Sequence, residues 1–183
     1  MDRQKALESV KENVANNNLV KHMLATEAVM RALAKRLGED EELWGLAGLV
    51  HDIDVELCGE DMSTHGKLGA DIARELGASE DMVHAILCHN EMMGVKRETL
   101  LDKALFCADP ITGLVTAAAL VRPEKKLEFV NIKSVCKRFK EKSFAAGANR
   151  EQIEKCSEIG LELDEFIELS LDAMKGIAGD LEL

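Results

Sequence analysis

The stretch Leu46-Ala47-Gly48-Leu49-Val50-His51-Asp52 places an imidazole and a carboxylate directly after five residues typical of a protein core. Histidine and aspartate are both common metal ligands, and neither is readily buried without a partner. The pair therefore predicts a site to which other segments of the chain contribute. All five histidines lie in the first half of the chain, which is consistent with such a site.

The composition predicts an all-α fold with an aliphatic, methionine-rich core. The 183 residues are 46% hydrophobic, which is enough for a sizeable core, and they include only 2 prolines and 3% aromatic residues. Good helix formers are abundant, whereas strand formers are not grouped. We expect a single domain over residues 1–183, with a metal-binding core over about 18–120 and a C-terminal helical extension over about 124–183.

Charge and cysteine content predict the environment. A formal net charge of −11 disfavours broad contact with a nucleic-acid polymer or an anionic membrane, although a small anion can still bind beside metal ions. The five cysteines are dispersed and form no C-x-x-C motif, which favours free thiols. The first residues lack the apolar core of a signal peptide, so we expect a cytoplasmic protein.

Helical periodicity and capping residues divide the chain into a series of helices. The pattern predicts helices over residues 19–37, 40–51, 63–76, 79–90 and 99–120, with a loop over 54–61. In the C-terminal half, the expected caps are Asn131, Asn149 and Asp164, and the expected stops are Gly147, Gly160 and Gly176. Pro110 is expected to bend the helix over 99–120.

The helical phase predicts which polar side chains point inward. Each residue advances a helix by about 100°, which places His22 on the same face as the apolar residues of its helix and Glu27 on the opposite face. His51 and Asp109 continue the apolar stripes of their own helices. A buried, unpaired carboxylate is costly, so a cation is the expected partner of Asp109.

The same phase separates the next two histidines. Five residues place His84 and His89 about 140° apart on a helix, so both can hardly serve one site. His89 borders the apolar face and is assigned to the site, whereas His84 is assigned to the surface. His65 begins its predicted helix, where phase does not decide.

The order His22, His51-Asp52, Asp109 resembles the HD superfamily of metal-dependent phosphohydrolases. The further segments His65-Gly66-x-x-Gly69 and Ala85-Ile86-x-x-His89 resemble the HDIG-type branch, although Asp54 stands where that motif has glycine. The resemblance covers about residues 18–118 and implies an α-helical bundle with additional C-terminal helices in this chain.

The resemblance also implies the metal ligands. One ion would be held by residues matching His22, His51, Asp52 and Asp109, and a second by His65 and His89, with Asp52 bridging the two. Imidazole and carboxylate donors suit one or two divalent ions of Fe, Mn, Co, Ni or Zn.

The expected activity is hydrolysis of a phosphoester by metal-activated water, with a small nucleotide as the favoured substrate. Asp52 would position the water, and Lys67 would neutralise a phosphate. Asp54 would assist proton transfer, unless it is simply a solvated acid of the loop. Two alternatives remain: a metal- or nucleotide-binding sensor without turnover, and a scaffold whose metal is structural.

Overall fold

The computed structural model describes residues 1–59 and 61–183. Within these ranges it is built from α-helices and short 3-10 helices and contains no β-strand, which confirms the predicted all-α fold. The helices are α1 (Arg3–Asn13), α2 (Asn17–Leu37), α3 (Glu41–Val50), α4 (Lys67–Glu75), α5 (Glu80–His89), η1 (Glu91–Met93), α6 (Leu100–Leu120), η2 (Leu127–Phe129), α7 (Ile132–Lys140), α8 (Arg150–Glu154), η3 (Lys155–Ile159), α9 (Leu163–Gly176) and α10 (Ala178–Leu181).

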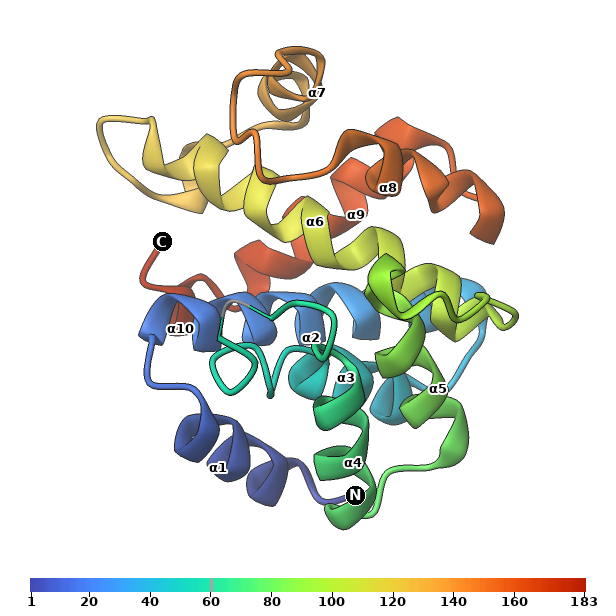
Figure 1. Cartoon of the computed structure of the whole chain (residues 1–183). Helices are drawn as coiled ribbons and strands as arrows, with labels where there is room; N and C mark the ends of the chain where they lie inside the picture. Colours follow the sequence, from blue (N-terminus) through green and yellow to red (C-terminus); the bar gives the residue numbers. More distant parts are fainter. Residues whose placement is uncertain (60) are drawn as a thin grey trace.

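Helix α2 crosses the middle of the molecule, with α1, α3, α4 and α5 on one side and α6 to α9 on the other (Figure 1). It contacts α3, α6 and α9 directly, and α6 also packs against α5, α7 and α8. Helix α6 is the most buried long helix of the fold. By length and composition alone it could cross a membrane, but 67% of its most apolar window is buried inside the protein.

Capping residues set the helix ends largely as predicted. Gly38 adopts a left-handed conformation with φ of 77° and ends α2. The side chains of Asp40 and Ser79 cap the N-termini of α3 and α5. Thr99 and Asp102 form the expected capping box at the start of α6. These side chains satisfy backbone N–H groups that have no partner within the first helical turn.

Three details of the predicted helices were wrong. Helix α4 begins at Lys67 rather than at 63 or 64, because residues 61–66 form turns that lead into Gly66. Asp164 lies in the first turn of α9, and Glu162 occupies the N-cap position. Helix α7 ends at Lys140 rather than at Gly147, which lies in the turns that follow. Helix α6 continues through Pro110, and the bend expected there stays a prediction. The predicted loop over 54–61 includes Glu60, which lies outside the described residues.

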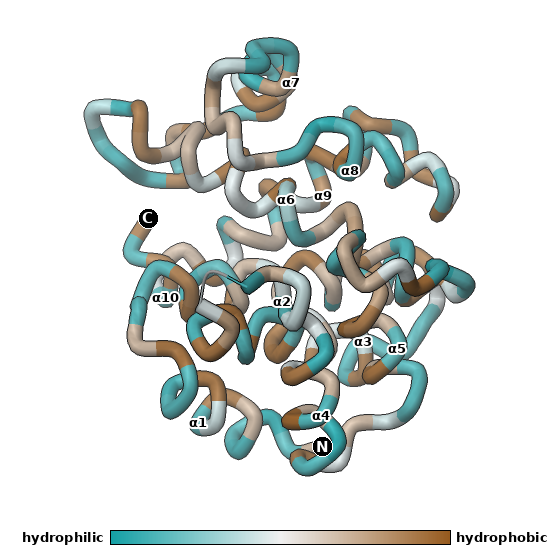
Figure 2. Tube along the Cα trace, in the orientation of Figure 1, coloured by the Kyte–Doolittle hydropathy of each residue, from teal (hydrophilic) through white to brown (hydrophobic). Residues whose placement is uncertain are grey.

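Helix α1 was not predicted, and it changes the environment of Glu27. This carboxylate was expected on the outward face of its helix but is buried. Arg3 of α1 donates to it from Nε at 2.6 Å and Nη2 at 2.8 Å, and Arg31 donates from Nε at 3.1 Å. Teal and brown residues alternate along α1 in Figure 2, as expected for a helix with one face against the core.

Candidate metal centre

All six predicted metal ligands meet at one place in the fold. They come from α2, α5, α6, the end of α3 and the turns that follow it. The group consists of His22, His51, Asp52, His65, His89 and Asp109. Their segments lie far apart in the sequence, so the tertiary packing of these helices assembles the group.

Asp52 is at the centre of the cluster. Its Oδ1 atom lies 3.3 Å from Nε2 of His51, 3.2 Å from Nε2 of His65 and 3.3 Å from Nε2 of His89. Its Oδ2 atom lies 3.5 Å from Nε2 of His22. One carboxylate therefore faces four imidazoles, which fits the bridging position that the resemblance implies.

Asp109 forms the second acidic point of the cluster. Its Oδ1 atom lies 3.1 Å from Nε2 of His22 and 3.8 Å from Nε2 of His51. One possible set of three metal donors is His22, His51 and Asp109, and another is His51, Asp52 and His89. Both sets include His51, whose one inward nitrogen can bind a single ion, so a second ion would depend on His65, His89 and a bridging Asp52.

Two of the imidazoles are oriented by helix ends. His51 follows the last residue of α3, and its Nδ1 lies 2.8 Å from the carbonyl oxygen of Gly48. His89 is the last residue of α5, and its Nδ1 lies 2.6 Å from the carbonyl oxygen of Ile86. A carbonyl only accepts, so Nδ1 carries the proton in both rings and Nε2 presents a lone pair. The negative ends of both helix dipoles face the cluster and favour a cation there.

The other two imidazoles are oriented by side chains. The Thr112 hydroxyl donates to the carbonyl oxygen of Asp109, so it accepts from Nδ1 of His22 at 2.9 Å. Nδ1 of His65 donates to Oδ1 of Asp54 at 2.8 Å. All four rings therefore have Nδ1 engaged as a donor and Nε2 directed into the cluster, as is usual for metal-binding histidines.

The inward nitrogens form a set of donors that needs a cation. Nε2 of His65 and Nε2 of His89 are only 3.1 Å apart, so either a proton or a metal ion must lie between them. Two nitrogens bound to one ion at about 2.1 Å are separated by about 3.0–3.4 Å. Nε2 of His51 is buried and has no hydrogen-bond partner among the described residues. The donor set therefore fits one or two divalent transition-metal ions.

Asp54 is the site residue whose environment was predicted least well from the sequence. The interpretation as a solvated loop acid was wrong, because the carboxylate is completely buried. Its Oδ2 accepts from the backbone N–H groups of Gly66 at 2.8 Å and Gly69 at 2.7 Å, at the start of α4. A Cβ at position 69 would lie 3.1 Å from the carboxylate carbon, so glycine leaves room for this acid. Asp54 thus fixes both His65 and the start of α4.

Two supporting residues were not assigned to the site by sequence. Thr112 lies one helical turn beyond Asp109 on α6, and its hydroxyl orients His22. The side chain of Asn90, directly after His89, donates to the carbonyl oxygens of His65 at 2.9 Å and Met62 at 2.8 Å. It therefore holds the turn that carries His65 against the end of α5. The available signals were a polar residue directly after His89 and another one helical turn after Asp109.

The two remaining candidate residues lie toward the surface. His84 is partly exposed, in agreement with its surface assignment, and its Nδ1 lies 3.1 Å from Oδ2 of Asp102. Lys67 is exposed at the first position of α4, two residues after His65.

Replacing Asp54 with asparagine is expected to weaken metal binding by about 10–100-fold, the usual effect of losing a carboxylate that orients a metal-binding histidine. The amide would also direct its NH₂ group toward a backbone N–H donor or toward Nδ1 of His65. Titration of metal into the stripped variant measures the effect. Asp81→Asn, at an exposed acid in the first turn of α5, is the control. Equal affinity in Asp54→Asn and the unmodified protein would show that Asp54 does not orient His65.

Metal affinity is expected to increase with pH. Burial alone would lower the pKa of His22, but hydrogen bonds to Asp109 and Asp52 raise it to about 10 in the metal-free protein. The pKa of His65 is likewise raised to about 10 by Asp52 and Asp54 despite burial. Both rings are therefore protonated at neutral pH, and a metal must displace these protons. Each released proton increases affinity about tenfold per pH unit. Calorimetry in buffers of different ionisation enthalpy counts them, and a count of zero contradicts this account.

Comparison with known proteins agrees with this geometry. The family model described as HD domain matches residues 19–114. The chain is 36% identical over 98 residues to "Ribonuclease Y" of Nitratidesulfovibrio vulgaris, covering 54% of this chain and 18% of that protein. It is 31% identical over 139 residues to "Ribonuclease Y" of Lawsonia intracellularis, covering 73% of this chain and 26% of that protein.

The chain therefore matches only about a fifth to a quarter of the length of these relatives. No solved structure matches it. The family match covers more than half of the chain and spans α2 to α6, the helices that carry His22, His51 and Asp109. The chain belongs to the HD-domain family.

Proposed function

We propose that this protein is a metal-dependent hydrolase of phosphoesters. The observation that carries the proposal is the convergence of four imidazole Nε2 atoms on Asp52, each ring held through Nδ1. Such a set holds one or two divalent transition-metal ions, with Fe, Mn, Co, Ni and Zn as the candidates. The family match supports hydrolytic chemistry in general.

The exposure of the cluster favours catalysis over a structural metal. The His51 side chain is fully buried, and those of His65 and His89 are 7% and 3% exposed. On the other side, Asp109 is 31% and His22 is 21% exposed. One side of the centre is therefore sealed and the other is open to solvent. Catalytic centres keep such an open position for water and substrate, whereas structural centres are saturated by protein ligands.

Bound metal would lower the pKa of water toward about 7 and polarise a phosphoryl oxygen. The residues of the chain supply orientation and charge. Asp52, at the centre, positions the attacking water, and Asp54 holds His65 in place. We also propose that the exposed ammonium of Lys67 contributes to phosphate binding from the start of α4. Asp54 has both oxygens engaged in hydrogen bonds, so orienting His65 is a better-supported role for it than proton transfer.

A small phosphorylated molecule, with a nucleotide as the favoured class, is our proposed substrate. The net charge of −11 opposes binding of a long polyanion. The name "Ribonuclease Y" of the relatives supports a second candidate, cleavage of RNA, since it names a phosphodiester polymer as their substrate. Both candidate substrates require the same attack on phosphorus. They differ in the rest of the substrate, which the surroundings of the metal centre would have to bind.

A substrate panel tests the proposal. The protein, stripped of metal and reloaded with Mn, Fe, Co, Ni or Zn, is assayed with p-nitrophenyl phosphate, bis-p-nitrophenyl phosphate, mononucleotides and single-stranded RNA oligonucleotides. We expect metal-dependent hydrolysis of the small substrates, measured as release of phosphate from the monoesters and of p-nitrophenol from the diester. Turnover of RNA alone would favour the second candidate. Bound metal without turnover of any substrate would contradict the hydrolase and favour a metal-dependent sensor. We further propose that the protein acts in the cytoplasm, where its five free thiols would stay reduced.

A further inference from the structure

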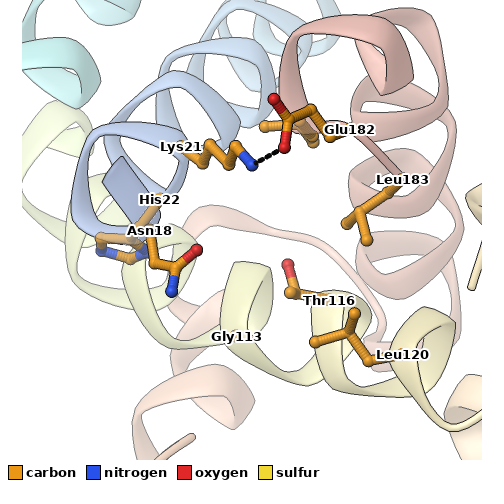
Figure 3. Close-up of a pocket in the computed structure, with 9 residues that line it drawn as sticks. Asn18, Lys21, His22, Gly113, Thr116, Leu120, Glu182 and Leu183 are labelled. Carbon is orange, nitrogen blue, oxygen red and sulfur yellow. Dashed lines mark hydrogen bonds and ion pairs between the residues drawn. The ribbon is translucent and has the colours of Figure 1, made fainter. Parts of the chain in front are cut away.

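A cavity of about 500 Å³ adjoins the open side of the metal centre. His22, whose Nε2 faces Asp52 and Asp109, is also part of the cavity wall. Figure 3 shows Asn18, Lys21 and His22 on one side, Gly113, Thr116 and Leu120 on another, and Glu182 and Leu183 closing a third. The cavity volume lies within the range for small-molecule sites.

The cavity continues from the metal centre along one face of α6 and one face of α2, as the spacing of the residues on these helices shows. Gly113, Thr116 and Leu120 follow Asp109 on α6 at four, seven and eleven residues, so all four share one face of that helix. Asn18 precedes His22 by four residues and occupies the same face of α2. A molecule with its phosphate at the metal centre would therefore extend along these two faces into the cavity.

The wall chemistry suits a small organic anion. Leu120, Leu181 and Leu183 provide apolar surface, and Asn18 and Thr116 provide polar groups. Gly113 contributes no side chain in the middle of α6, where glycine costs about 1 kcal/mol relative to alanine.

Lys21 is the cation of the cavity wall. Its side chain is only 19% exposed, and its Nζ lies 2.5 Å from a carboxylate oxygen of Glu182, whose side chain is 72% exposed. The lysine is thus held in place by the fold, whereas its partner lies largely in solvent. An anionic ligand group can replace this carboxylate without leaving a buried acid unpaired.

From this arrangement we infer that the cavity binds the organic part of a mononucleotide-sized phosphoester, with Lys21 contacting an outer oxygen of its phosphate where the metal centre meets the cavity, and with Glu182 competing for the same lysine. The inference rests on the proposed function, because it assumes that the reacting phosphate lies at the metal centre. It favours a small substrate over RNA, because one lysine in a closed wall matches a single anionic group rather than a row of phosphates.

Calorimetric titration of the methylene phosphonate analogue of adenosine monophosphate, which the metal-loaded full chain cannot hydrolyse, tests this inference. Lys21→Met keeps the apolar stem and is expected to weaken binding about tenfold or more, since a hydrogen bond to a charged group contributes about 1.5–3 kcal/mol. Glu182→Gln removes the competitor and is expected to strengthen binding several-fold. Thr116→Phe fills the cavity and is expected to abolish binding. Lys155→Met, which breaks the exposed pair with Glu158, is the control and leaves affinity unchanged.

The metal content of every variant is measured in parallel. Unchanged affinity in Lys21→Met with normal metal content would overturn the inference, as would tighter binding of an RNA oligonucleotide that does not depend on Lys21. Turnover of p-nitrophenyl phosphate separates this result from a failure of the proposed function. If that ester is hydrolysed but the affinity for the nucleotide does not depend on Lys21, the proposed hydrolase activity stands and the cavity assignment is wrong. If nucleotide binding depends on Lys21 but no substrate is turned over, the cavity assignment stands and the proposed hydrolase activity is wrong.

Discussion

Replacing Asp52 with alanine is expected to remove both metal binding and turnover. This carboxylate faces all four imidazoles, with oxygen-to-Nε2 distances from 3.2 to 3.5 Å. Loss of a residue that only supports a ligand typically costs about 10–100-fold, so loss of the central ligand is expected to exceed that range. Elemental analysis of the variant measures metal per chain, and hydrolysis of the best small substrate measures activity.

Asp172→Ala provides the control, because Asp172 is an exposed acid on α9. Asp52→Asn keeps the shape but removes the charge, and it should also lose activity. Full turnover by folded, metal-free Asp52→Ala would refute the role assigned to this residue. Helix content by circular dichroism establishes whether the variant is folded.

Gly48→Val is expected to lower the free energy of unfolding by about 3 kcal/mol and to weaken metal binding. A Cβ at this position would lie 2.8 Å from the carbonyl oxygen of Thr26 and 3.0 Å from the backbone nitrogen of Glu27. These atoms belong to the backbone of α2, so α3 must move away from α2. The carbonyl of Gly48 accepts from His51, and that movement therefore displaces a predicted metal ligand.

Urea unfolding of the metal-free protein measures this effect on stability without the contribution of the metal. Gly113→Ala is the matched control. It is also a glycine within a long helix, but its Cβ would meet only the Cβ of Ala148, at 4.0 Å. Higher helix propensity is expected to stabilise this control by up to about 1 kcal/mol. Equal stability of Gly48→Val and the unmodified protein would show that the two helices do not depend on this close approach.

Sequence periodicity predicted most of the helices because the core stripes and caps are local signals. Gly38, Asp40, Ser79 and Thr99 act on backbone groups within a few residues. The inward direction of His51 also follows from its place on the stripe of one helix. Local signals of this kind can be interpreted from the sequence without knowledge of the tertiary structure.

The parts that were missed depend on contacts between distant segments. Glu27 lies on the side of α2 that periodicity marks as outward, and it is enclosed by Arg3 of α1 together with Arg31. Asp54 follows the end of a helix in a polar stretch, and only the backbone of α4 reveals why it is buried. The ligand role of His65 was likewise predicted from family resemblance and not from helical phase. Its position depends on Asp54 and Asn90, which lie 11 and 25 residues away in the sequence.

Anomalous diffraction from crystals of metal-loaded protein, recorded at the absorption edge of the added metal, tests the central claim most directly. Our account predicts one or two anomalous peaks enclosed by His22, His51, Asp52, His65, His89 and Asp109, with nitrogen and oxygen ligands only. Peaks confined to other parts of the molecule, or none after loading with each candidate metal, would contradict it.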